Sequence, residues 1–283
     1  MIWSCADAEL DLAVRTHVMG ILNVTPDSFS DGGLYIDPGQ AIQRGLQMAA
    51  EGADIIDVGG ESTRPGSEPV SAEKEIKRVL PVIEGLASQC GCLISIDSSK
   101  AKVAEEALQA GARIVNDISG MTFDPEMARL VSRTRAGVVL MHIKGVPRNM
   151  QRNPHYEDVT AEICAVLRDH IEEAVQAGVA PQRIVIDPGI GFGKRVTDNL
   201  TLIRELGRLG SLGRPILVGP SRKSFIGEVL DLPADQRLEG TLAAVAVSVI
   251  NGARIVRVHD VKAVRRAVDT VDAILNAAFG PDS

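Results

Sequence analysis

One local pattern recurs along this chain: a helix-like stretch ends in Gly-Ala, and a short apolar run follows at once. It occurs at residues 52–56 (GADII), 111–115 (GARIV) and 252–256 (GARIV). Glycine is preferred just past a helix end because it tolerates a positive φ. A repeated unit of helix, glycine stop and strand predicts a fold in which β and α elements alternate.

Eight apolar runs are predicted to be strands, at residues 17–22, 54–58, 92–96, 113–117, 137–141, 183–187, 215–219 and 254–258. Most are continuously apolar, which is typical of parallel strands buried on both faces. The segments between them carry apolar residues at helical spacing. A (β/α)8 TIM barrel takes about 250 residues. We therefore expect a single α/β barrel domain over residues 1–283, with residues 1–16 forming a cap before the first strand.

Composition narrows the function classes. The formal net charge of −7 argues against a nucleic-acid-binding surface. No apolar run approaches the roughly 20 residues that cross a bilayer, and no signal peptide precedes the first strand. We therefore expect a cytoplasmic protein without membrane partners. Free structural thiols are expected at all four cysteines, which are Cys5, Cys90, Cys92 and Cys164.

Polar residues stand at the predicted strand exits, where (β/α)8 barrels carry their active sites. Asp97, Asn116 and Asp187 each close an apolar run directly. A carboxylate accepts hydrogen bonds from amino and ring N–H groups, and an amide both donates and accepts them. Strand ends are also simply where polarity begins, but this combination at one mouth suits a flat heterocycle with amino and amide edges.

A basic set gathers at other strand exits and comprises Arg64, Lys223, Arg257 and His259. Arg257 and His259 are alternate residues of one strand, so both can face the mouth. The loops after strands 7 and 8 commonly bind phosphate in these barrels. Each cation alone could equally form a surface salt bridge, as Arg257 could with Asp260 or another carboxylate. Their convergence favours an anion site.

Other motifs do not fit. Residues 189–194 (GIGFGK) resemble a phosphate-binding loop, but position 188 is proline and position 195 is arginine. His142 lacks a zinc-like partner and is expected to pack or to support other residues of the site. No Gly-x-Ser-x-Gly segment is present, which argues against a serine hydrolase.

Several longer motifs are similar to those of the dihydropteroate synthases, a group of pterin-binding enzymes. They lie, in order, at residues 19–33, 57–66, 116–120, 140–142, 187–194, 221–227 and 257–261. The resemblance implies a transferase of folate biosynthesis. That enzyme joins 6-hydroxymethyl-7,8-dihydropterin pyrophosphate to p-aminobenzoate and gives 7,8-dihydropteroate and pyrophosphate.

The resemblance also implies roles for individual residues. The pterin would be bound by Asp97, Asn116, Met141, Asp187, Phe192, Gly219 and Lys223. Pyrophosphate would be bound by Asn23, Arg64, Arg257 and His259, with Mg2+ on Asn23. The p-aminobenzoate site would comprise Phe29, Thr63, Arg64, Pro65, Ser221 and Lys223. The catalytic residues would be Arg64, Lys223, Arg257 and His259.

Family membership further implies inhibition by sulfonamides and a homodimer. The long segments 23–37 and 59–71 are rich in Gly, Pro and Ser and are expected to close over pyrophosphate. Two other functions remain open from the sequence. One is a corrinoid-linked methyltetrahydrofolate methyltransferase, which shares the barrel and the pterin pocket. The other is a pterin-binding paralogue without catalytic activity.

Overall fold

The computed structural model describes residues 1–25, 37–63 and 66–276. Its centre is a closed barrel of parallel strands in the order β10-β3-β4-β5-β6-β7-β8-β9. The strands are β3 (His17–Asn23), β4 (Ile55–Gly59), β5 (Leu93–Asp97), β6 (Ile114–Asp117), β7 (Gly137–Met141), β8 (Ile184–Asp187), β9 (Ile216–Val218) and β10 (Ala253–Val258). The barrel and all eight predicted strands are confirmed.

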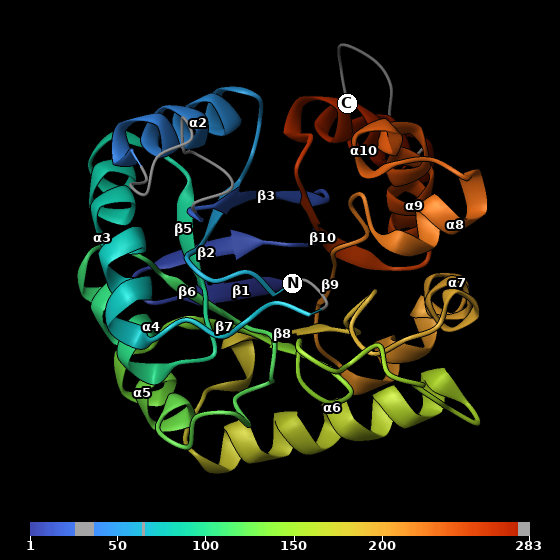
Figure 1. The fold of residues 1–283 in the computed structure, drawn as a ribbon, viewed down its shortest axis with the longest axis horizontal. Coiled ribbons are helices and arrows are strands. Elements are labelled where there is room, and N and C mark those ends of the chain that lie inside the picture. Colours follow the sequence, from blue (N-terminus) through green and yellow to red (C-terminus); the bar gives the residue numbers. More distant parts are fainter. Residues whose placement is uncertain (26–36, 64–65, 277–283) are drawn as a thin grey trace.

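The helices form a ring around these strands (Figure 1). They are α2 (Pro38–Ala50), α3 (Ala72–Gln89), α4 (Ala101–Gln109), α5 (Met127–Thr134), α6 (Val159–Gln176), α7 (Val196–Arg204), α8 (Ser224–Leu230), α9 (Leu238–Ile250) and α10 (Val261–Asn276). Short 3-10 turns lie at η1 (Pro181–Arg183), η2 (Leu206–Leu212) and η3 (Ala234–Gln236). Asp37, Ser71 and Asp158 cap α2, α3 and α6 by accepting from backbone N–H groups, which fixes where each helix begins.

Side chains inside the barrel lie in two contrasting layers, because alternate residues of a strand point to the same side. The lower layer is apolar and consists of Met19, Ile55, Leu93, Ile114, Val139, Val185, Leu217 and Ile255. Two residues further along six of the strands, the upper layer is polar or glycine: Asp57, Ser95, Asn116, Asp187, Gly219 and Arg257. Core and site thus share the same strands.

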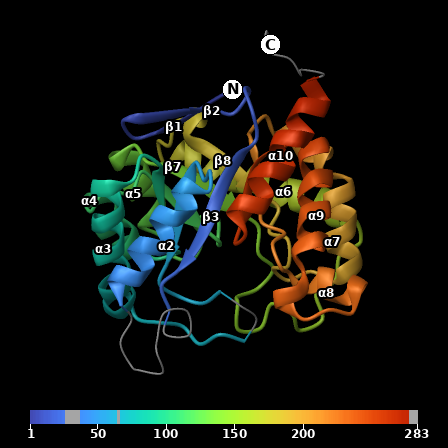
Figure 2. The ribbon, with the colours of Figure 1, turned by 90° about the horizontal axis from the view of Figure 1, so that it is seen from above.

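A hairpin of β1 (Ile2–Cys5) and β2 (Ala8–Asp11) closes the N-terminal end of the barrel. Trp3 is fully buried against the lower layer and donates from Nε1 to the Arg183 carbonyl at 2.8 Å. A Cβ added at Gly137 would lie 2.5 Å from Cys5 Sγ, so only glycine fits below the hairpin. Figure 2 shows the hairpin at the end opposite α8, which follows a strand exit.

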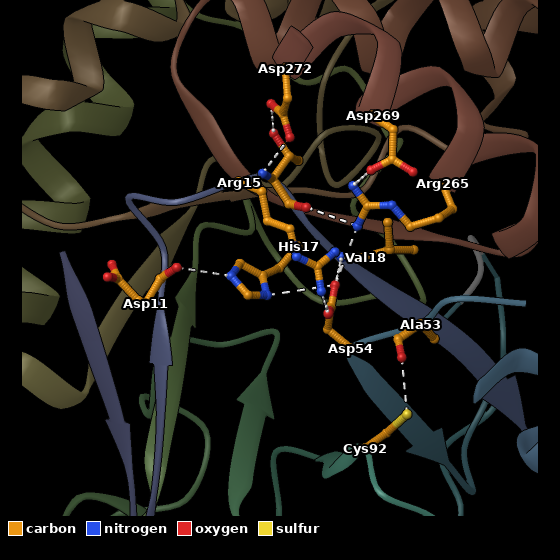
Figure 3. Close-up of polar contacts among 11 residues, drawn as sticks. Asp11, Arg15, His17, Val18, Ala53, Asp54, Cys92, Arg265, Asp269 and Asp272 are labelled. Atoms are coloured by element: carbon orange, nitrogen blue, oxygen red, sulfur yellow. Dashed lines mark hydrogen bonds and ion pairs between the residues drawn. The ribbon is translucent and has the colours of Figure 1, made fainter. Parts of the chain in front are cut away.

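Polar contacts hold this closed end together around Asp54 (Figure 3). Its carboxylate pairs with Arg15 and lies 3.5 Å from both His17 Nδ1 and Arg265 Nη1. The adjacent Thr16 donates its N–H to Asp272 of α10 at 2.7 Å. The start of β3, the first strand of the barrel, is therefore tied to α10, the last helix, at the end away from the strand exits. Among the described helices, none has the length and apolar character needed to cross a bilayer.

Candidate active site

The polar groups predicted for the pterin converge at the barrel mouth. Asp97 and Asn116 are direct neighbours in the register of β5 and β6, and Asp187 ends β8. All three are almost fully buried, at 8%, 4% and 5% exposure. An apolar group lies beside them and consists of Ile118, Met141, Met150 and Phe192. Polar edges next to an apolar surface suit a flat, hydrogen-bonding ring.

Arg257 bridges two carboxylates at the centre of this mouth. Its Nε donates to Asp57 Oδ2 at 2.6 Å and its Nη2 donates to Asp97 Oδ2 at 2.6 Å. Asn116 Nδ2 also donates to Asp57 Oδ2, at 2.9 Å. Asp57 is fully buried and was not predicted, although it faces inward by strand alternation. The second oxygens of Asp57 and Asp97 accept no hydrogen bond from the described residues, so they can accept from a ligand.

The alternative interpretation, in which Arg257 forms a salt bridge with Asp260 or another carboxylate, is met by Asp57 and Asp97 and not by Asp260. Asp260 instead pairs with Arg222, at 3.0 Å from Nε and 2.6 Å from Nη2. The reason is that Arg257 points into the barrel while Asp260 lies past the strand end, next to the loop after β9. Arg257 therefore contacts the expected pterin residues, whereas the sequence predicted a role toward pyrophosphate alone.

Burial sets the ionisation of the mouth carboxylates. It raises the pKa of Asp97 to about 7, and the Arg257 charge only partly opposes the shift. It also raises the pKa of Asp187 to about 6, against the Gly189 N–H group and the Lys223 charge. One guanidinium serves both Asp57 and Asp97, so the buried trio keeps a net charge of −1 when both carboxylates are ionised. A ligand with several N–H donors can compensate that charge.

Three of the predicted anion residues, Lys223, Arg257 and His259, lie at this pocket. Ser221 Oγ is 3.0 Å from His259 Nδ1 and accepts from the His259 N–H group at 3.2 Å. Burial and the Arg257 charge lower the pKa of His259 to about 4, so the ring is neutral at pH 7. Lys223 Nζ lies 4.1 Å above the centroid of the Phe192 ring, a cation–π contact that places its charge beside the pterin residues.

Two further predicted residues lie at the rim. A Cβ added at Gly59 would be 3.7 Å from Asn23 Oδ1 and 3.5 Å from Asp97 Cβ, so the Asn23 amide lies beside the pocket. Gly219 faces the Arg257 side chain, with 3.7 Å from an added Cβ to Arg257 Cβ. Within the described residues, no group of three or more His, Cys, Asp or Glu side chains could hold a metal ion.

The loop after β4 is fixed at its base. Glu61 Oε1 accepts from the Val70 N–H group at 2.7 Å, which closes the segment between them. Lys100 binds Glu61 and donates to the fully buried Glu75 at 2.6 Å. Thr63 is half-buried within this loop. The remaining residues predicted for the two long loops, Phe29, Arg64 and Pro65, lie outside the described residues.

Lys194 is a second residue that the sequence reasoning missed. The failed phosphate-loop motif contains it, and the structure buries it behind the mouth with 3% exposure. Its Nζ is 3.0 Å from His142 Nδ1. The expectation that His142 supports other residues agrees with this contact, because burial and the Lys194 charge lower its pKa to about 2 and keep the ring neutral.

The fold and the site define a (β/α)8 barrel enzyme that holds a flat polar heterocycle next to an anion. The sequence model of the pterin binding enzyme family matches residues 19–259. The chain belongs to this family. Within it, the chain is 48% identical over 265 residues to the dihydropteroate synthase of Synechocystis, covering 93% of this chain and 92% of that one. It is 45% identical over 268 residues to that of Escherichia coli, covering 95% and 94%.

Solved structures agree. The Yersinia pestis dihydropteroate synthase in a sulfonamide complex superposes with a TM-score of 0.92 at 43% identity, covering 98% of this chain and 100% of that one. The Xanthomonas albilineans enzyme with 4-aminobenzoic acid gives 0.91 at 44% identity, covering 97% and 98%. The chain is thus a transferase of folate biosynthesis with dihydropteroate synthase activity.

Proposed function

We propose that the mouth of the barrel binds the dihydropterin ring through Asp97, Asn116 and Asp187 and stacks it against Met141 and Phe192. The observation that carries this proposal is the burial of three polar groups next to an apolar surface. Asp57 is added to the predicted set because it shares Arg257 with Asp97. Solved complexes of the Xanthomonas albilineans relative with 7,8-dihydropteroate support a pterin site in this fold.

Stabilising the leaving group is the main demand of the reaction. The bond from the pterin methylene carbon to pyrophosphate oxygen breaks, the aniline nitrogen of p-aminobenzoate bonds to that carbon, and the nitrogen loses a proton. Negative charge grows on pyrophosphate, so preorganised cations and hydrogen-bond donors lower the barrier. Lys223, Arg257 and His259 lie where they can contact the departing pyrophosphate. Arg64, in the loop after β4, is expected to join them.

Arg257 is proposed to turn toward pyrophosphate in this scheme. Ring N–H groups donate to the second oxygen of Asp97 and offset its charge, so the contact of Asp97 with Arg257 Nη2 weakens and the guanidinium becomes available to the departing pyrophosphate. The electron-rich pterin ring can also help to expel pyrophosphate from the methylene carbon, which gives the transition state cationic, SN1-like character. Recognition of the ring and stabilisation of the leaving group would then be coupled through one side chain.

Mg2+ is proposed to arrive with pyrophosphate and to bind Asn23. The single amide oxygen at the rim fits this arrangement, because Mg2+ usually keeps several waters and binds substrate phosphates with few protein ligands. When bound, it would neutralise part of the charge on the leaving group.

The p-aminobenzoate is proposed to bind at the outer edge of the pocket. Ser221 and Lys223 lie there, and Thr63 is carried by the clamped loop after β4; Phe29 and Pro65 are proposed on the family resemblance. Sulfonamides are proposed to occupy the same place, as the sulfonamide complex of the Yersinia pestis relative suggests.

A homodimer through the α7–α9 face is also proposed. Helix α9 is apolar on nearly every side, which is unusual for a helix that faces solvent. Its Val247 and Ile250 are 42% and 58% exposed, and the contacting helices α7 and α8 carry the exposed Leu200 and Val229. Introducing Val247→Glu should convert the dimer to a monomer in analytical ultracentrifugation. The cytoplasmic location stays a prediction.

The deciding experiment is pyrophosphate release. Release should require both the pterin pyrophosphate and p-aminobenzoate, and should stop when either is omitted. Pterin binding without any release would instead indicate a non-catalytic paralogue. Methyl transfer from methyltetrahydrofolate to a corrinoid would indicate the methyltransferase.

A further inference from the structure

Among the described residues near the mouth, Lys194 is a buried cation that the proposed reaction does not use. It closes the segment that follows β8, and none of the carboxylates among the described residues forms a salt bridge with it. A buried ammonium without an ion-pair partner is costly, and such groups concentrate at functional sites.

The contacts of Lys194 Nζ join two loops of the pterin pocket. It lies 3.0 Å from His142 Nδ1 and donates to the His142 carbonyl at 3.5 Å, directly after β7. It also donates to the Phe192 carbonyl at 3.0 Å, after β8. The Phe192 ring in turn carries Lys223 Nζ on its face. One ammonium thus joins the segments that carry His142 and Phe192, next to the apolar group of the pterin pocket.

The same ammonium lies behind Asp187. Gly189 donates its N–H to Asp187 Oδ1 at 2.7 Å, and a Cβ added at Gly189 would be 3.3 Å from Lys194 Nζ. That Cβ would also be 1.9 Å from the His142 carbonyl oxygen, and Gly189 has a φ of +69°, so only glycine allows this close packing. The loop therefore folds tightly around the lysine.

We propose that Lys194 is a positioning residue for the pterin pocket, which fixes the loops after β7 and β8 and places a positive charge behind the Asp187 carboxylate. This inference rests on the proposed role of Asp187 in binding the pterin. It assigns a role to a residue that lies one layer behind the ligand and does not touch it.

The charges around the two groups support the proposal. Burial lowers the pKa of Lys194 to about 7, with the Asp187 charge opposing the shift. Burial raises the pKa of Asp187 to about 6, and its neighbours lower it. Each charge opposes the shift that burial causes in the other group, so the ionised carboxylate and the protonated lysine stabilise one another. The groups that face this pair are Lys223, Arg257, Asp198, Lys144 and His142.

The sign of the pH effect follows. Ionised Asp97 and Asp187 both accept hydrogen bonds from ring N–H groups, so pterin affinity falls as the pH drops through the raised pKa values of the two carboxyl groups. Without the Lys194 charge, burial raises the pKa of Asp187 further. The loss of affinity then begins at a higher pH than in the unmodified protein.

The test compares Lys194→Met with Lys102→Met, which removes a charge that is 62% exposed on α4. Affinity for 6-hydroxymethyl-7,8-dihydropterin pyrophosphate is measured by calorimetry across the range from acid to alkaline pH. Lys194→Met should bind at least about tenfold more weakly at neutral pH, and its loss of affinity on acidification should begin at higher pH. Lys102→Met should match the unmodified protein in both respects.

Lys194→Gln is measured alongside, because it keeps a donor but no charge and is a second route if Lys194→Met does not fold. Its loss of affinity on acidification should also begin at higher pH, while its affinity at neutral pH should fall less. Weaker binding in a folded variant whose pH dependence is unchanged would overturn the proposal, since a loss of packing alone gives that result. If the unmodified protein fails to bind the pterin, the proposed function fails instead.

Discussion

Replacing Arg257 with alanine should lower both turnover and stability, for separate reasons. The side chain forms ion pairs of 2.6 Å with each of Asp57 and Asp97, and only 17% of it is exposed. Removing one partner of a buried ion pair costs about 3–5 kcal/mol. At about 2–4 °C per kcal/mol, the melting temperature should fall by roughly 6–20 °C at alkaline pH.

The stability loss should depend on pH. The Asp97 pKa is already about 7, well above its unfolded value, and losing Arg257 raises it further. A carboxyl group with a raised folded pKa destabilises the fold increasingly as the pH rises above its unfolded pKa, because it must be ionised while buried. The difference in melting temperature should therefore be small near pH 5 and grow toward pH 8, as calorimetry at several pH values would show.

Turnover separates the leaving-group role from the structural one. If Arg257 stabilises departing pyrophosphate by about 1.4 kcal/mol, the rate of pyrophosphate release falls about tenfold. The matched control is the double variant Asp57→Asn with Arg257→Ala, which removes one of the stranded carboxylates. It should regain part of the stability but none of the turnover, because Asp97 stays buried without Arg257.

Two results would refute this reasoning about Arg257. A melting difference that does not change with pH would show that Arg257 does not neutralise the buried carboxylates. At alkaline pH, where Asp97 is ionised with or without Arg257, affinity for 7,8-dihydropteroate, which lacks pyrophosphate, should stay nearly unchanged. If it fell there as far as affinity for pyrophosphate, the leaving-group role would be wrong.

Three further predictions concern the two ends of the barrel. Asp187→Asn should keep the fold and weaken pterin binding by about 1.5–3 kcal/mol in calorimetry, because a charged acceptor is lost; unchanged affinity would exclude its role. Sulfonamides should compete with p-aminobenzoate in steady-state kinetics, and inhibition that excess p-aminobenzoate cannot relieve would contradict the shared site. Trp3→Ala should lower stability by about 3–5 kcal/mol while leaving KM for both substrates unchanged, since it empties only the lower end; altered KM values would contradict that separation.

The strands were predictable because Gly-Ala stops and continuous apolar runs are local signals. Asp57 was missed because it lies inside such a run, and only the alternation of side chains shows that it faces the mouth. The pairing of Arg257 with Asp57 and Asp97 joins residues 200 and 160 positions apart, which no local pattern reports. Lys194 was set aside because its motif fails as a phosphate loop, and its partner His142 lies 52 residues away.

The closed N-terminal end has a consequence for how such a chain tolerates change. Trp3 and the contacts around Asp54 hold the barrel together at the end opposite the substrates. A substitution in the mouth that evades an inhibitor can be destabilising, and most proteins lie only slightly above the stability they require. Improved packing beneath the hairpin can restore that margin without altering any residue that meets a ligand. Compensating changes should therefore accumulate at the hairpin end, where the residues do not contact an inhibitor.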